Sequence, residues 1–304
     1  MQGEIFYWIF NMSIIASVMG LIVLVLRKLR FIPHRVSVFL WIIPFIRMCI
    51  PFGINSRYSL MTLISRFTTR TITVYEPAEG IAFSYSNTLR AANSYFPITY
   101  KVNILDKVFK VAGSIWIVVV LSILISLGIL YFSTIHEVRD AKLLEKNIYL
   151  SDKVTSPAVY GIIRPRIILP EPYAAGDLKY VLLYERTHIR RLDNLWRLLG
   201  FMAAAIHWFN PLSWVFLKVF LSDLELACDE QAVARCNEQD RKEYAHTLLK
   251  SASSKSLFVS AFGGAKVRTR IENILSQKPM TVLSSVGFTA LIAAILYALL
   301  TNAG

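Results

Sequence analysis

Long apolar stretches without charged side chains recur along the chain and predict helices that cross a membrane. Residues 5–26 carry no charge, and as a helix they would extend about 33 Å, enough to cross the hydrocarbon core of a bilayer. Comparable stretches lie at 36–54, where Arg47 is the one charged residue, and at 108–133 and 280–301. The pattern therefore predicts four transmembrane helices.

The polar segments between these helices predict the topology. The short loop 27–35 is strongly basic, whereas the segment 55–107 offsets its basic residues with acidic ones. Because Lys and Arg favour the cytoplasmic side, we expect the N-terminus outside, 55–107 as an extracellular loop and 134–279 as a cytoplasmic domain. Alternation over 71–85 favours short strands in the outer loop.

A fifth apolar stretch, 198–221, is interrupted by polar residues and by Asn210-Pro211. Asn-Pro favours a turn, and proline disfavours helical backbone in the residue before it. We therefore predict a helical hairpin that dips into the membrane or lies against it, and we interpret His207 within it as structural.

Composition agrees with a membrane protein. The 304 residues are 55% hydrophobic and 17% charged, whereas soluble domains are about 45–50% apolar and about 25% charged. These values exclude an average soluble enzyme and a disordered chain. The formal charge of +13 would suggest nucleic acid in a soluble protein, but the cytoplasmic segment is nearly balanced. We expect attraction to anionic membrane lipid and no direct nucleic-acid binding.

Candidate chemistry lies in the helical pattern of 179–197. Tyr184, Glu185 and His188 have the spacing of the zincin motif H-E-x-x-H, in which two histidines one turn apart bind zinc and the glutamate acts as general base. Here the first histidine is replaced by Tyr184. Alone, a Glu-x-x-His pair is common on solvated helix faces.

A second helical segment adds carboxylates at a spacing of one turn. Glu225 could supply a third zinc ligand, and Asp229 could orient an imidazole. The hairpin at 198–221 would bring Glu225 back to the level of His188, whereas a single span would place them on opposite sides of the membrane. We interpret Cys228 between them as a small buried residue.

Several motifs together resemble the BlaR/MecR-type integral-membrane metallopeptidases, relatives of beta-lactam-sensing regulators. They are GIIRPRIILP (161–170), YERTHIRRLDNLW (184–196), HWFNPLSW (207–214), ELACDEQAV (225–233) and KVRTRIENIL (266–275). The resemblance implies a mainly α membrane protein with a cytoplasmic gluzincin-like metallopeptidase domain and a small β element. It also implies a Zn²⁺ cofactor.

The resemblance also implies individual roles. Glu185 would be the general base, His188 and Glu225 zinc ligands, and Asp229 a residue behind the ligands. The strand-like residues Arg166, Ile167, Ile168 and Leu169 would be the edge against which a peptide substrate pairs. Tyr184 departs from the family pattern, because a phenol binds zinc poorly unless ionised. Tyr184 itself, Cys228 or Asp229 could complete the ligand set.

The function that this resemblance implies is an antirepressor. It would cleave a cytoplasmic transcriptional repressor, or itself, after an external signal, with 256–270 as a candidate cleavage region. The alternative is a catalytically impaired pseudopeptidase that acts as a membrane scaffold or regulatory partner. A transport component, suggested by Arg47 alone, is the weakest hypothesis.

The sequence also raises the question of how a signal is sensed. Unlike the antibiotic-resistance receptors, it contains no S-x-x-K motif. We expect a short form without the penicillin-binding sensor domain, or a truncated receptor, and a separate sensor protein is one option. The stimulus and the oligomeric state stay open, with a homodimer as one arrangement.

Overall fold

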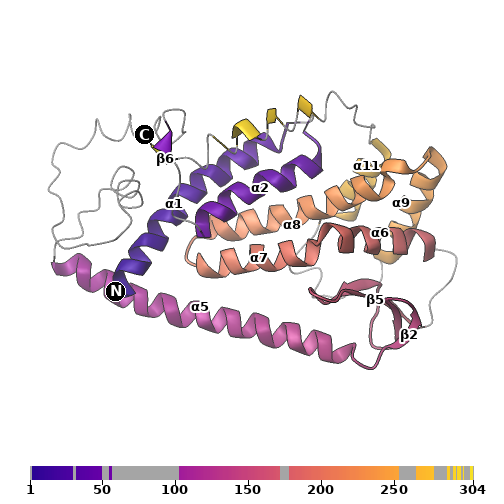
Figure 1. The fold of residues 1–304 in the computed structure, drawn as a ribbon, viewed down its shortest axis with the longest axis horizontal. Coiled ribbons are helices and arrows are strands. Elements are labelled where there is room, and N and C mark those ends of the chain that lie inside the picture. Colours follow the sequence, from indigo (N-terminus) through magenta and orange to yellow (C-terminus); the bar gives the residue numbers. More distant parts are fainter. Residues whose placement is uncertain are drawn as a thin grey trace.

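The protein is mostly helical, with a four-stranded sheet at the end of the molecule opposite the N-terminus (Figure 1). The structure is a computed structural model, and it describes residues 2–29, 32–49, 55–56, 103–171, 178–252 and 265–276 together with scattered positions from 286 to 303. The strands expected over 71–85 lie outside the described residues.

Helices α1 (Gln2–Leu26) and α2 (His34–Cys49) pack side by side and share a core with α7 and α8. The apolar sequence of α1 leaves no charged face within the helix, so α1 buries side chains on one side and exposes apolar ones on the other. The core of these four helices includes Met19, Trp41, Phe216 and Phe220.

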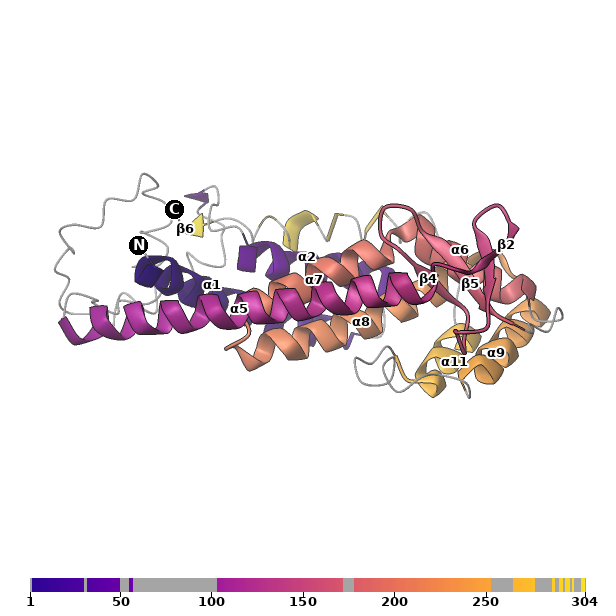
Figure 2. The ribbon, with the colours of Figure 1, turned by 90° about the horizontal axis from the view of Figure 1, so that it is seen from below.

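Helix α5 (Asn103–Glu137) runs along one side of the molecule and ends at the four-stranded sheet (Figure 2). Within the described residues, α1 and the part Lys107–Glu137 of α5 are the two helices long and apolar enough to cross a membrane. Only 6% of the most apolar window of α5 is buried, against 50% for α1. The helix expected at 280–301 falls largely outside the described residues.

The apolar stretch at 198–221 forms parts of two helices rather than one span. Helix α7 (Asp193–Ile206) ends before a short turn, and α8 (Pro211–Ala232) begins at the proline. Asn210 caps α8, since its side-chain oxygen accepts a hydrogen bond from the Leu212 amide at 3.0 Å. Proline at the first helical position fits this cap.

The sheet contains β2 (Lys142–Glu145), β3 (Ile148–Ser151), β4 (Ala158–Tyr160) and β5 (Arg166–Pro170). Its strand order is β2-β3-β5-β4, with β3 and β5 parallel and the outer pairs antiparallel. Ile148, Ile167 and Leu169 pack against Val181 of helix α6 (Leu178–Arg191). The sheet thus covers one side of α6.

The remaining elements surround the other side of α6. The 3-10 turn η2 (Val233–Arg235) follows α8, and helices α9 (Glu238–Ala252) and α11 (Val267–Ser276) come after it. Tyr180, Val233, Tyr244 and Ile274 form the core among these elements. Two short strands, β1 (Asn55–Ser56) and β6 (Asn302–Ala303), pair in parallel elsewhere.

Buried ion pairs fix α8 to the loop between α1 and α2. The Asp223 carboxylate is fully buried and accepts hydrogen bonds from Arg27 at 2.6 and 2.9 Å and from the Trp41 indole at 2.8 Å. The Glu230 carboxylate accepts the backbone amides of His34 and Arg35 at the start of α2. The connection between α1 and α2 is therefore bonded to α8.

A glycine pair tests the packing of α1 on α8. A Cβ atom on Gly20 would overlap the ring of Phe216, whereas a Cβ on Gly128 of α5 meets no atom within 4 Å. Gly20→Ala should destabilise the protein by about 1–3 kcal/mol through overpacking. Gly128→Ala should be neutral or stabilising, because alanine favours helix over glycine. Thermal unfolding in detergent measures both, and equal effects would contradict the close approach.

Candidate functional site

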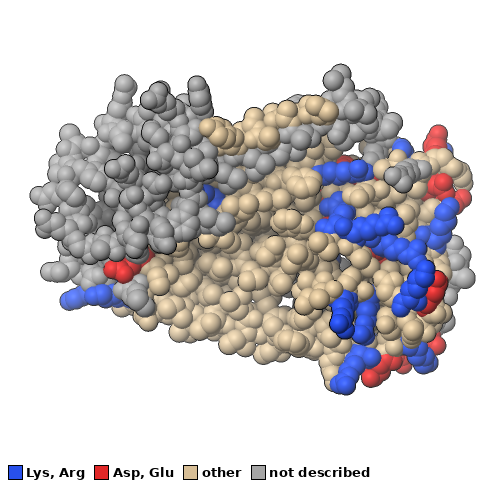
Figure 3. Space-filling model, in the orientation of Figure 1, with Lys and Arg blue, Asp and Glu red and all other residues tan. Residues whose placement is uncertain are grey.

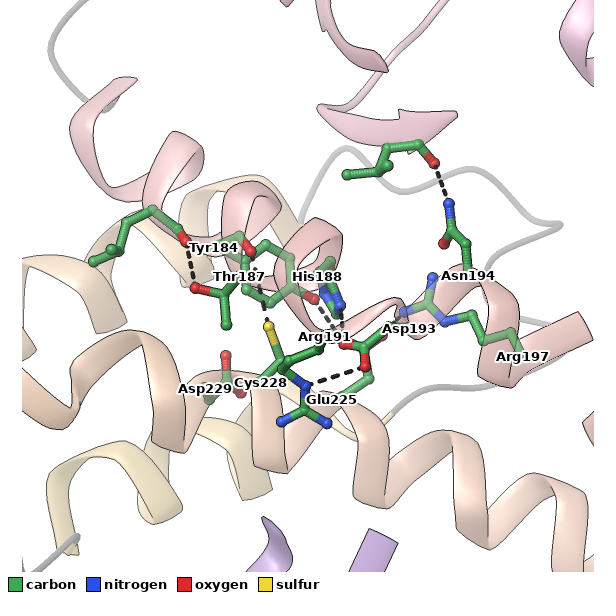
Figure 4. A network of polar contacts seen from close by, with 12 residues as sticks. Tyr184, Thr187, His188, Arg191, Asp193, Asn194, Arg197, Glu225, Cys228 and Asp229 are labelled. Atoms are coloured by element: carbon green, nitrogen blue, oxygen red, sulfur yellow. Dashed lines mark hydrogen bonds and ion pairs between the residues drawn. The ribbon is translucent and has the colours of Figure 1, made fainter. Parts of the chain in front are cut away.

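The predicted site residues of α6 and α8 face one another around a cavity. Tyr184 and His188 lie one turn apart on α6, with ring centroids 4.4 Å apart, and Glu225 approaches them from α8 (Figure 4). The cavity measures about 180 Å³ and is lined by both helices, β4, α7, α9 and α11. The predicted hairpin geometry therefore does bring Glu225 to the level of His188.

Glu225 has hydrogen-bond partners on both carboxylate oxygens. Oε1 accepts from Arg197 of α7 at 2.5 Å, and Oε2 accepts from the Tyr184 hydroxyl and lies 3.3 Å from Arg270 Nη1. Burial acts to raise the pKa of Glu225, but the guanidiniums of Arg270 and Arg197 outweigh it and hold that pKa well below its usual range. The carboxylate is therefore ionised and already neutralised.

Tyr184 keeps its proton in this environment. Burial raises the pKa of its phenol well above the ordinary value. The neutral hydroxyl donates its hydrogen to Glu225, and the guanidinium of Arg270 lies 4.7 Å from the centre of its ring. Tyr184 therefore acts as a hydrogen-bond donor and packing surface for this ion-pair cluster.

Asp229 has a different environment from the one predicted. Its carboxylate accepts a bidentate pair of hydrogen bonds from Arg270, both at 2.7 Å, and one from the Tyr244 hydroxyl at 2.9 Å. Arg270 is 1% exposed and links Asp229 to Glu225. Asp229 therefore orients this arginine, and the expected contact with the imidazole of His188 is made by another residue.

That residue is Asp193, at the start of α7. Its Oδ2 lies 2.6 Å from His188 Nδ1, and its Oδ1 accepts from Arg191 at 3.1 Å. The second ring nitrogen of His188, Nε2, is buried and has no hydrogen-bond partner. An imidazole held by a carboxylate on one nitrogen, with the other nitrogen open, is the usual state of a metal-binding histidine.

Glu185 follows Tyr184 on α6 and lines the same cavity. Its side chain is 5% exposed, and burial raises its pKa. A carboxyl with a raised pKa can exchange a proton nearer neutral pH, which is what a general base requires. Its predicted catalytic role stays a prediction.

The predicted substrate edge is wrong. Residues Arg166 to Leu169 form β5, which lies between β3 and β4 and pairs with both. Because both sides of β5 are bonded, it cannot accept a further strand. The edge strand at the cavity is β4, where Asn194 of α7 donates to the carbonyls of Val159 and Gly161 at 3.2 and 3.1 Å.

The donor groups at the cavity can be compared with the ligands that a zinc ion needs. A site of family type needs three ligands, yet within the described residues only Nε2 of His188 is buried and open among the predicted donors. Glu225 and Asp229 are bonded to arginines, and Tyr184 is protonated. The residues present do not fit a three-ligand zinc site.

A second group of possible metal ligands does not complete a zinc site either. Ligand atoms of His188, Asp193 and Cys228 lie within 4.8 Å of one another. Asp193 is already bonded to His188 and Arg191, and burial raises the pKa of the Cys228 thiol well above its usual value. A thiol must lose its proton to bind a metal.

Comparison with known proteins identifies relatives. A family model described as "BlaR1 peptidase M56" matches residues 7–274. The regulatory protein BlaR1 of Bacillus licheniformis is 28% identical over 180 residues, covering 54% of this chain and 30% of that protein. The methicillin resistance mecR1 protein of Staphylococcus aureus is 26% identical over 117 residues, covering 37% and 20%. The chain thus aligns with less than a third of the length of either relative.

Two arginines on α11 test the importance of the cluster. Arg270 is 1% exposed and bridges two buried carboxylates, whereas Arg268 is exposed and pairs with Glu272 at 2.8 Å. Arg270→Gln should lower the free energy of unfolding by about 3–5 kcal/mol, because it leaves buried charges unpaired. Arg268→Gln should cost less than about 1 kcal/mol. Denaturant unfolding in detergent measures both values, and similar losses would contradict the assignment.

Proposed function

Since this chain belongs to the BlaR1 peptidase M56 family, we propose that it is a membrane-embedded signal transducer whose peptidase-type site works without hydrolysis. In this function the cytoplasmic domain acts as a regulatory partner or scaffold. The family is one of zinc metallopeptidases, so zinc is the metal that its members use in general. The donor groups at the cavity of this chain nevertheless favour a site that binds little or no metal.

The observation that carries the proposal is the environment of Glu225. Tyr184, Arg197 and Arg270 supply hydrogen bonds and positive charge to the carboxylate that the resemblance assigns to zinc. A metal ion would have to displace these partners and approach two guanidiniums. The repulsion between a dication and two nearby cations opposes such binding in a buried site.

The membrane arrangement is part of the proposal. Two apolar helices and the family relationship support membrane association. We place four spans, the N-terminus outside, and residues 134–279 inside as a gluzincin-like domain. The basic loop 27–35 supports this orientation.

The partner we propose is a cytoplasmic transcriptional repressor. The similar proteins are named as regulatory and methicillin resistance proteins. A chain without hydrolysis would bind such a repressor, or a second membrane protein that senses the signal, rather than cut it. The external stimulus reaches the domain through the membrane helices bonded to α8.

A second candidate is an active zinc peptidase that cleaves the repressor or itself. The open, buried Nε2 of His188, with Nδ1 bonded to Asp193, favours it. Buried Glu185 in the same cavity would then be the base.

Zinc content and cleavage separate the two candidates. The full chain, Tyr184→His, Glu185→Ala and the double variant Tyr184→His/His188→Ala are purified in detergent and analysed by elemental mass spectrometry. Each is also co-expressed with a candidate repressor. We expect little zinc and no cleavage for the unaltered chain, and a gain of zinc in Tyr184→His that is lost in the double variant.

The Tyr184→His exchange adds an imidazole and removes the hydrogen bond from Tyr184 to Oε2 of Glu225, which is the reason for the expected gain. Stoichiometric zinc with Glu185-dependent cleavage in the unaltered chain would rule out the proposed function and support the second candidate. A Tyr184→His variant that binds no zinc would mean that the site assignment is wrong.

A further inference from the structure

Two neighbouring turns expose large apolar side chains. Ile163, in the turn between β4 and β5, is 93% exposed, and Leu192, between α6 and α7, is 55% exposed. Gly161 has φ +88° and Leu192 has φ +56°, a region that a leucine rarely adopts. Both turns therefore combine a residue with left-handed backbone and an apolar side chain that is exposed.

The two turns belong to one surface. The Asn194 side chain, two residues beyond Leu192, donates hydrogen bonds to Val159 and Gly161 in the chain leading to Ile163. The turn after β4 is therefore fixed against the first turn of α7. An exposed apolar surface of this kind marks an interaction site.

Arginines accompany both apolar residues. Arg164 follows Ile163 and Arg190 precedes Leu192, and both arginines are exposed. Nearby Arg191 is bonded to Asp193, and Arg166 lies over the ring of Tyr149. Lys and Arg gather over this end of the molecule, next to the uncharged surface along α5 (Figure 3).

Apolar exposed stripes lead away from this surface. On α7 the stripe begins at Leu192 and continues through Leu195, Leu199 and Met202 at helical spacing. On α5 exposed apolar residues continue to Phe132, and exposed charged residues of both signs follow, including Glu137 and Arg139. Both stripes thus end at charged residues, as expected where hydrocarbon meets the headgroups of a membrane.

We propose that the turns 161–164 and 190–193 form a docking surface for anionic phospholipid headgroups of the cytoplasmic leaflet. Ile163 and Leu192 lie at the hydrocarbon boundary, and Arg164 and Arg190 face the phosphates. This inference rests on the membrane placement in the proposed function. Because β4 lines the cavity, the docked lipid surface also fixes one wall of the site.

Spin labels on introduced cysteines test the proposal in the full chain, with Cys49 and Cys236 replaced by serine and the buried Cys228 left in place. Labels at Ile163→Cys and Leu192→Cys are compared with Val118→Cys, which is 64% exposed on α5, and Leu249→Cys, which is 56% exposed on α9. The chain is reconstituted in nanodiscs of phosphatidylglycerol with phosphatidylcholine, or of phosphatidylcholine alone. Power saturation measures access to oxygen and to a water-soluble nickel chelate.

We expect the labels at 163 and 192 to favour oxygen in the anionic bilayer, as the label at 118 does, while the label at 249 favours the nickel chelate. Arg164→Gln with Arg190→Gln should shift both turn labels toward the value at 249, as should neutral lipid. Labels at 163 and 192 that match 249 in anionic lipid, or that ignore lipid charge, would overturn the proposal. A water-exposed label at 118 would instead overturn the membrane placement.

Discussion

The pairing of buried carboxylates on α8 is the constraint on which the structure depends. This helix carries three buried acids and a fourth, Glu225, whose side chain is 12% exposed, and a buried charge persists only when it is paired and hydrogen-bonded. Asp223 is bonded to Arg27, Glu225 to Arg197 and Arg270, Asp229 to Arg270 and Tyr244, and Glu230 to the start of α2. These partners come from elements far apart in the sequence. The hydrogen bonds and ion pairs to the acids of α8 therefore fix how those elements pack against one another.

The same constraint determines what the site can do. Asp223 and Glu225 are two residues apart, about 200° around a helix, so they face different neighbours. One side of α8 is bonded to Arg27 and to the start of α2, whereas Glu225 on the other side lines the cavity. A displacement of α1 and α2 that keeps the Arg27–Asp223 pair must therefore move Glu225 as well. In the proposed function, this link carries the signal to the site without hydrolysis.

Local patterns predicted much of this arrangement, and pairings between distant segments accounted for the rest. The uncharged run at 5–26 and the Asn210-Pro211 turn define α1, α7 and α8 by themselves. The spacing of Glu185 and His188 placed both at the cavity. The partners of His188, Glu225 and Asp229, which are Asp193, Arg197 and Arg270, could not be predicted. The sequence does not show which charged residues will pair when distant segments pack together. Strand order is equally non-local, so β5 was mistaken for an edge.

The arginines explain how a metallopeptidase-type frame can persist with Tyr184 in place of a histidine. Without a cation, the buried Glu225 and Asp229 would repel each other and resist burial. Arg270 contacts both carboxylates and lies over the Tyr184 ring, and its permanent positive charge together with that of Arg197 balances them without a bound ion. Tyr184 contributes a proton to Glu225 where a zinc-binding imidazole would offer a lone pair. The frame and the ion-pair cluster are thus mutually consistent, which is why the proposed function does not depend on hydrolysis.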